Sequence, residues 1–280
     1  VTVVSSSNLQ VRDCEIRQIG GDQGVALESC TDAEVSNCRL RSIDGGAVLV
    51  FGAGTARVTV RDNDILNCSD GAIFVFGDDS LIANNVTDVT NGGISIRGTG
   101  TTVRDNVIRS SLDAGIRVDQ ATQCVITNNR VREFNQQGIA LEGTTSDLDV
   151  TDNVITDGRV NSNAAIEVGC SNSRILRNRA VRCGEGFFVS GDNCALRDNV
   201  VKSSLQDGFD FATSAAICVL DNDTAVDCAA EGLDNSGSGT KVTNCTFKNC
   251  RIDVANDGSF QLFSGNTFVT GGQATPPEID

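Results

Sequence analysis

One short pattern recurs from end to end of this chain, and it restricts the fold more than any other feature of the sequence. In Val103–Val118, VRDNVIRSSLDAGIRV, an apolar residue is followed by Asp-Asn and a further apolar residue, then by a short turn, a glycine and alternating apolar residues. The first half recurs with its leading apolar residue at Val11, Val35, Val60, Ile82, Ile126, Val150, Leu176, Leu196, Val219, Val242 and Phe263. The step between copies averages about 23 residues, within the range that is typical of solenoids.

The second half of the pattern keeps the same period. Its glycine recurs at Gly24, Gly46, Gly71, Gly93, Gly115, Gly138, Gly186, Gly208 and Gly232, and Ala165 fills one gap. A repeat this short has no room for two helices, and its apolar residues alternate with the period of a strand. The sequence therefore predicts an all-β fold: a single right-handed parallel β-helix of about 12 coils, with like positions stacked about 4.8 Å apart.

The Asp-Asn and glycine positions have structural explanations. An inward-facing Asn at a bend can bond main-chain groups and the Asn of the next coil, and Asn tolerates left-handed backbone geometry. Glycine supplies positive φ or room for close packing. We expect the β-helix to occupy residues 1–270 as one domain, and the Gly- and Pro-containing segment 271–280 to form a flexible tail.

Composition excludes several classes of partner. The chain carries 22 basic and 37 acidic residues, a net charge of −15, and lacks the basic face that nucleic acid requires. No apolar run approaches the ~20 residues of a membrane span. We expect a secreted, periplasmic or cell-surface protein, with self-association through the open solenoid ends as an option.

The cysteines fall into rows of the repeat. Cys14, Cys38 and Cys245 occupy the Asn position, and Cys68, Cys183, Cys228 and Cys250 follow the first strand. Cysteine is a small buried hydrophobe that stacks well in such rows. We expect buried free thiols. Bridges between the neighbouring pairs Cys14/Cys38 and Cys228/Cys250 remain an alternative, whereas the CxxC spacing of a zinc site is absent.

One outward position, the residue between the two apolar residues after the glycine, changes character along the chain. We place Ala26, Val48 and Ile73 there in the first coils, then Ser95, Arg117 and Ala140. Later coils place there Glu167, Phe188, Asp210 and Asp234, and just before the glycine Glu185, Asp207 and Glu231. A strip of carboxylates with one Phe is predicted over four coils.

Paired carboxylates on adjacent coils suit acid–base chemistry. Asp210 and Asp234 would lie about 5 Å apart, the spacing of a retaining glycosidase pair, and Asp207 and Glu231 form a second pair. Like charges this close raise one pKa, which supplies a general acid beside a base. The same carboxylates are suited to Ca²⁺, and a third interpretation is a solvated wall that keeps the solenoid soluble.

The string DGFDF, Asp207–Phe211, resembles the N-T-D-G-[FI]-D stretch of the polygalacturonase family, and EGLDNSG, Glu231–Gly237, resembles its second acidic segment. The resemblance implies Asp207 as general acid, with Glu231 and Asp210 or Asp234 activating water. Gln206 and Glu231 depart from that pattern, and the family's Gly-His-Gly and Arg-Ile-Lys elements are missing.

The whole chain resembles, more broadly, the β-helix proteins that bind or process carbohydrates: pectate lyases, mannuronan epimerases and a periplasmic protein of copper-enzyme maturation. Alginate-type lyases and epimerases use His and Tyr, and neither occurs here, so that mechanism is excluded for this chain acting alone. A pectate-lyase-like alternative would use Ca²⁺ and an Arg base, with Arg182, Arg197 or Arg117 as candidates.

Two functional hypotheses follow. In the first, the chain binds or processes polysaccharide. Its catalytic residues are then Asp207, Asp210, Glu231 and Asp234, its substrate-binding residues are Arg117, Glu167, Glu185 and Phe188, and its reaction is glycoside hydrolysis or Ca²⁺-dependent lysis. In the second, it is a non-catalytic structural or adhesive module of a larger surface protein.

Overall fold

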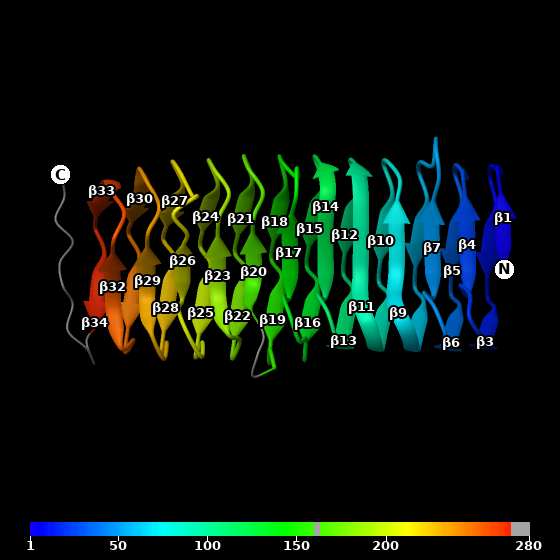
Figure 1. Ribbon diagram of the computed structural model, residues 1–280, viewed down its shortest axis with the longest axis horizontal. Coiled ribbons are helices and arrows are strands. Elements are labelled where there is room, and N and C mark those ends of the chain that lie inside the picture. The colour runs from blue at the N-terminus through cyan, green and yellow to red at the C-terminus, as the bar shows by residue number, and fades with distance from the viewer. Residues whose placement is uncertain (160–162, 270–280) are drawn as a thin grey trace.

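Short parallel strands stack into one long solenoid (Figure 1). A computed structural model describes residues 1–159 and 163–269, so the predicted tail 271–280 lies outside the described residues. The described residues form 34 strands and no helix, and all the strand pairs are parallel. The chain advances one coil at a time from the N-terminal end to the C-terminal end (Figure 1). The predicted parallel β-helix is confirmed.

Each coil contributes a strand to each of three faces. The first face is a 12-stranded sheet, made of β2(Gln10–Arg12), β5(Glu34–Ser36), β8(Thr59–Arg61), β10(Leu81–Ala83), β12(Thr102–Arg104), β15(Val125–Thr127), β18(Asp149–Thr151), β21(Arg174–Leu176), β24(Ala195–Arg197), β27(Val219–Asp221), β30(Thr240–Thr243) and β33(Phe260–Ser264). The second face is made of β3(Glu15–Ile19), β6(Arg39–Ile43), the first halves of β9(Asp64–Phe76) and β11(Val86–Thr99), β13(Val107–Ser111), β16(Arg130–Arg132), β19(Val154–Thr156), β22(Arg179–Val181), β25(Val200–Lys202), β28(Thr224–Val226), β31(Thr246–Lys248) and β34(Thr267–Val269).

The third face follows the glycine of each repeat. It comprises β1(Thr2–Val4), β4(Val25–Glu28), β7(Val48–Phe51), the second halves of β9 and β11, β14(Ile116–Thr122), β17(Ile139–Glu142), β20(Ala164–Val168), β23(Glu185–Val189), β26(Phe209–Phe211), β29(Glu231–Asn235) and β32(Ile252–Asn256). Because β9 and β11 run through the turn, the second and third faces join into one 22-stranded sheet.

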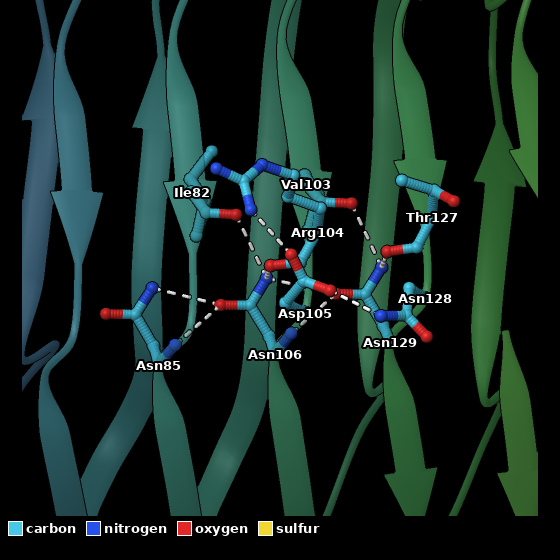
Figure 2. A network of polar contacts seen from close by, with 9 residues as sticks. All are labelled: Ile82, Asn85, Val103, Arg104, Asp105, Asn106, Thr127, Asn128 and Asn129. Atoms are coloured by element: carbon cyan, nitrogen blue, oxygen red, sulfur yellow. Dashed lines mark hydrogen bonds and ion pairs between the residues drawn. The ribbon is translucent and has the colours of Figure 1, made fainter.

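The bend between the first and second faces contains the predicted ladder. The Asn106 side chain accepts a hydrogen bond from the Asn85 amide nitrogen at 3.0 Å, and donates one to the Ile82 carbonyl and another to Asn129 (Figure 2). Register places twelve residues in this row: Cys14, Cys38, Asn63, Asn85, Asn106, Asn129, Asn153, Asn178, Asn199, Asp223, Cys245 and Asn266. The left-handed conformation belongs to the preceding residue instead, as in Asp105 with φ 57°.

Register corrects the predicted repeat at two copies on the first face. Ile175 and Leu220, rather than Leu176 and Val219, are the inward residues that align with Val103 along the stack. The prediction slipped by one residue because Leu176 and Val219 are themselves apolar. The shift brings Asp223 into the Asn row, a substitution that the sequence reading missed.

Register also corrects the glycine row and the outward row in early coils. Val48 and Ile73 are fully buried and align with Val25, so the outward residues are Leu49 and Phe74. The small residues before them are Ala47 and Ala72, not Gly46 and Gly71. In each of these coils a glycine is followed by an alanine, and the prediction assigned the glycine to the row instead of the alanine.

Aliphatic, Phe and Cys side chains from all three faces fill the interior in rows. All twelve cysteines are free thiols, and every one except the half-buried Cys14 is buried. The glycine row serves close packing: a Cβ on Gly115 would lie 2.3 Å from Val131 Cγ1 and 2.7 Å from the Gly138 oxygen. The result is a rigid wall in which outward side chains on each face repeat at the strand spacing.

Candidate functional site

The predicted carboxylates gather on the third face, between β20 and β29. We call Glu167, Glu185, Asp207, Asp210, Glu231 and Asp234 the acidic strip. Glu167, Asp210 and Asp234 point outward from β20, β26 and β29, while Glu185 and Glu231 begin β23 and β29 and Asp207 precedes β26. All six are half-buried. The order along the outward row is Glu167, Phe188, Asp210, Asp234, as predicted.

Asp207 and Glu231 are in direct contact at the edge of the third face. The Glu231 main-chain N–H donates to Asp207 Oδ1 at 2.7 Å. Burial raises the pKa of Asp207 to about 7, and a side-chain hydrogen bond with Glu231 acts in the same direction. Arg251 Nη2 lies 3.1 Å from Glu231 Oε1 on the other side. Asp207 therefore holds its proton more tightly than an ordinary carboxyl group, and Arg251 lies beside Glu231.

Asp210 and Asp234 face outward from paired strands. They are register partners, so their main chains are about 4.8 Å apart. Burial, followed by the charge of Asp234, raises the pKa of Asp210 to about 6. Burial also raises the pKa of Asp234, with the charge of Glu231 second. A water molecule beside Asp210 would therefore meet an ionised carboxylate at neutral pH.

A pocket of about 260 Å³ adjoins the strip, and its lining includes Glu167, Glu185 and Phe188. Burial raises the pKa of Glu185 to about 7, with the charges of Asp210 and Glu167 as further causes. Glu167 Oε2 accepts a hydrogen bond from Gln137 Nε2 at 2.5 Å. The Phe188 ring is half-exposed between two carboxylates, an arrangement that offers an apolar surface with polar groups at its rim.

Arg117, also predicted to bind substrate, lies elsewhere. It projects outward from β14, two strands before β20 in the stack. Its Nη1 is 2.6 Å from Glu142 Oε2, and its Nη2 is 2.9 Å from Asp113 Oδ1. The ion pairs hold it in a second pocket of about 260 Å³ that Phe74, Ser95 and Asp113 also line.

The sequence reading missed this second pocket, together with Gln137 and Arg251 as partners of the strip. The pocket could have been predicted from the outward row if Phe74, rather than Ile73, had been placed in it. Among the described residues no group of three or more His, Cys, Asp or Glu side chains is placed to hold a metal ion. Nor does the described part of the chain contain a helix of the length and apolarity needed to cross a membrane.

The coil geometry, the Asn row and the stacked core define a right-handed parallel β-helix with an outward carboxylate strip. A sequence model described as right handed beta helix region matches residues 92–252, more than half of the chain. The chain belongs to this β-helix family. A second model, described as periplasmic copper-binding protein (NosD), matches residues 7–169. No curated protein matches the sequence.

Solved structures of the same fold include three carbohydrate- or phage-related proteins. The Dettilon tailspike protein matches with a TM-score of 0.66 at 15% identity, over 96% of this chain and 60% of its own. The periplasmic alginate epimerase AlgG matches with a TM-score of 0.66 at 10% identity, over 99% of this chain and 77% of its own. A GH87 α-1,3-glucanase from Streptomyces thermodiastaticus has a TM-score of 0.58 at 16% identity, covering 95% and 63%. At these identities the likeness establishes the fold, and the chain spans 60% of the tailspike's length.

Proposed function

We propose that this protein binds a polysaccharide along its third face and hydrolyses glycosidic bonds at the acidic strip. The observation that carries the proposal is the hydrogen-bonded pair Asp207 and Glu231 beside Asp210, half-buried and open to solvent on a rigid face. Raised carboxyl pKa values in an accessible cluster are a common feature of catalytic sites. An extracytoplasmic location fits this substrate, and it is supported by the match to a periplasmic copper-binding family and by the likeness to a periplasmic epimerase.

The roles follow from the pKa values. Between pH 6 and 7, Asp207, whose pKa is raised to about 7, keeps its proton, while Asp210, whose pKa is raised to about 6, has lost it. Asp207 therefore donates a proton to the glycosidic oxygen as the bond breaks. Asp210 accepts a proton from the water that attacks the sugar carbon, and Asp234 and Glu231 support these two groups. A sugar ring stacks on Phe188, and Glu167 and Glu185 accept hydrogen bonds from the hydroxyl groups of that sugar.

The test is an assay for new reducing ends and for unsaturated products over a panel of polysaccharides. Reducing ends without unsaturation support hydrolysis, whereas unsaturated products would indicate a lyase. Asp207→Asn and Asp210→Asn should each lower the rate at least 100-fold, in line with general acid–base catalysis. Asp88→Asn, a half-buried outward carboxylate on the second face, is the matched control and should leave the rate unchanged.

Two outcomes would contradict the proposal in different ways. Wild-type rates in both Asp207→Asn and Asp210→Asn would mean that the acidic strip is not the site. Binding without any product from the whole panel would favour the non-catalytic module.

A further inference from the structure

The second pocket on the third face is built like a sugar-binding site and has no role in the chemistry above. It lies between β9, β11 and β14, has a volume of about 260 Å³, and is lined in part by Gly71, Gly92 and Gly93. A Cβ on Gly92 would meet only the Gly71 Cα, at 3.8 Å, so a ligand can approach the main chain at Gly92. One wall is the Phe74 ring and the opposite wall is the Arg117 side chain.

Phe74 is held as a fixed platform. A Cβ on Gly71 would lie 2.5 Å from its Cζ, and one on Gly46 would lie 3.1 Å from its Cε2, so the ring covers bare main chain at both residues. The side chain is half-exposed. An aromatic ring fixed on one side and exposed on the other suits the apolar face of a sugar.

Arg117 supplies a fixed polar wall rather than a free positive charge. Its guanidinium group bonds Asp113 through Nη2, at 2.9 and 3.0 Å, and Glu142 through Nη1, at 2.6 Å. Two carboxylates therefore surround one cation, and the lining itself contains Asp70 and Asp113 beside Arg117. The pocket carries a net negative charge, with carboxylate oxygens and the Ser95 hydroxyl available to sugar hydroxyl groups.

The pocket and the acidic strip share one face of the solenoid. From Phe74 on β9 to Phe188 on β23 the stack takes five steps, β11, β14, β17, β20 and β23, or about 24 Å. Both positions belong to the same outward row. A single extended polymer chain that follows this row would contact both phenylalanines.

Charge decides which polymers are compatible with this path. Arg97 and Arg117 are the outward arginines on the third face between β9 and β23, and both are in ion pairs, Arg97 with Asp119 at 2.8 Å. The carboxylates at both ends exceed these cations. A polyuronate would bring further negative charge into this field, and like charges in a partly desolvated contact are strongly unfavourable.

We propose that the pocket of Phe74 and Arg117 is a second sugar-binding site, and that the polysaccharide is neutral rather than acidic. This rests on the proposed function for the path along the third face, and it adds a substrate class and a distant anchoring site. One ring of the polymer stacks on Phe74 while another lies at Phe188. The second site raises the affinity for long chains, because once one part of the polymer is bound, the other part binds without a further loss of translational freedom.

Electrophoresis through gels that contain a polysaccharide measures this binding without a need for turnover. The probes are dextran, α-1,3-glucan, β-1,3-glucan and galactomannan as neutral polymers, and alginate and polygalacturonate as acidic ones. We expect retardation by at least one neutral polymer and none by the acidic pair. Phe74→Ala should weaken it about fivefold or more, the loss of one stacking contact.

Two further variants keep the test specific. Ser95→Gln fills the pocket without changing Phe74, and should weaken binding as well if circular dichroism confirms the fold. Phe51→Ala removes a half-exposed aromatic side chain of β7 that lies outside the pocket, and should bind as the wild type does.

The outcomes separate this inference from the proposed function. Unchanged retardation in both Phe74→Ala and Ser95→Gln would overturn the pocket, while product formation that depends on Asp207 would still stand. Retardation only by alginate or polygalacturonate would overturn the neutral substrate class. Weakened binding in the pocket variants, with no product formed from any polymer, would support the pocket and remove the hydrolase.

Discussion

Replacing Asp223 by Asn should stabilise this protein, and by more as the pH rises. Asp223 is the one carboxylate among the twelve positions of the Asn row, and it is 1% exposed. Its Oδ1 accepts hydrogen bonds from the Asn199 N–H at 2.6 Å and from Asn199 Nδ2 at 2.9 Å. Its Oδ2 accepts one from the Asp221 N–H at 3.0 Å. These donors stabilise the charge, but burial outweighs them and raises the pKa of Asp223 to about 8.

The sign of the pH effect follows from the two states of the chain. In the unfolded chain the pKa of Asp223 is close to the ordinary value of 3.8. The folded protein therefore keeps a proton that the unfolded chain has released, so the contribution of Asp223 to stability is greatest below pH 4. It falls as the pH rises to about 8 and is constant above that. At about 1.4 kcal/mol per pH unit, the loss by pH 7 is about 4 kcal/mol.

Asn at this position removes that loss, because its side chain keeps a donor at every pH, whereas Asp223 has one only while it is protonated. Elsewhere in the row Nδ2 donates to the carbonyl of the previous coil, as Asn199 does to Ile175 at 2.7 Å. An Asn at 223 would bond the Leu196 carbonyl in the same way. The gain is close to zero at pH 4, where Asp223 is protonated, and about 4 kcal/mol at pH 7, the size of the pH-dependent loss.

Thermal unfolding followed by circular dichroism at pH 4, 6 and 8 measures this difference. Asp221→Asn is the matched control two residues away. Hydrogen bonds from Thr243 and Asn244 lower the pKa of Asp221, so its replacement should cost stability, and the cost should shrink as the pH falls toward 3. A difference in Tm between Asp223→Asn and wild type that stays constant from pH 4 to 8 would refute the reasoning.

Three other predictions concern the site and the coil. Hydrolysis should follow a bell-shaped pH profile, because activity is lost below about 6 as Asp210 gains its proton and above about 7 as Asp207 loses it, and a profile flat across this range in initial-rate assays would contradict the roles. Ile217 is 63% exposed at φ 57°, a conformation that costs a β-branched residue about 1 kcal/mol, so Ile217→Asn should raise the urea midpoint. Gly115→Ala should destabilise by about 1–3 kcal/mol in the same titration, because its Cβ would lie 2.3 Å from Val131 Cγ1.

The sequence predicts the coil well because each rung of the ladder repeats the same local chemistry. Asn106 requires only another Asn at the same position of the adjacent coil. Cys38 and Cys245 fit the row because each Sγ lies 3.6 Å from the equivalent carbonyl oxygen of the previous coil. The contact between Asp207 and Glu231 was predicted on the same basis. Residues at equal positions of adjacent repeats are neighbours whatever their identity.

The ion-pair partners that fix Arg117 in the second pocket were beyond such reasoning because they come from unequal positions of the repeat. Asp113 stands in a turn and Glu142 near the end of a strand, yet both reach the guanidinium group of Arg117. A long side chain crosses the strand spacing, so its partners depend on rotamers and not on the repeat. The misplacement of Phe74 added to this, since a shift of one residue moves a side chain from the outer surface to the core.

The fixed strand spacing also limits what this face can recognise. Main-chain hydrogen bonds hold successive outward side chains about 4.8 Å apart, so Phe74 and Phe188 cannot move relative to one another without breaking the stack. A ligand that contacts both rings must therefore be long and flexible enough to fit the fixed distance between them. A neutral polymer can adjust its path over a surface of carboxylates through hydroxyl hydrogen bonds alone, whereas a regularly charged chain would need cations at a matching interval. The outward arginines on this stretch of the third face are held in ion pairs with Asp113, Asp119 and Glu142, which leaves no such row of cations.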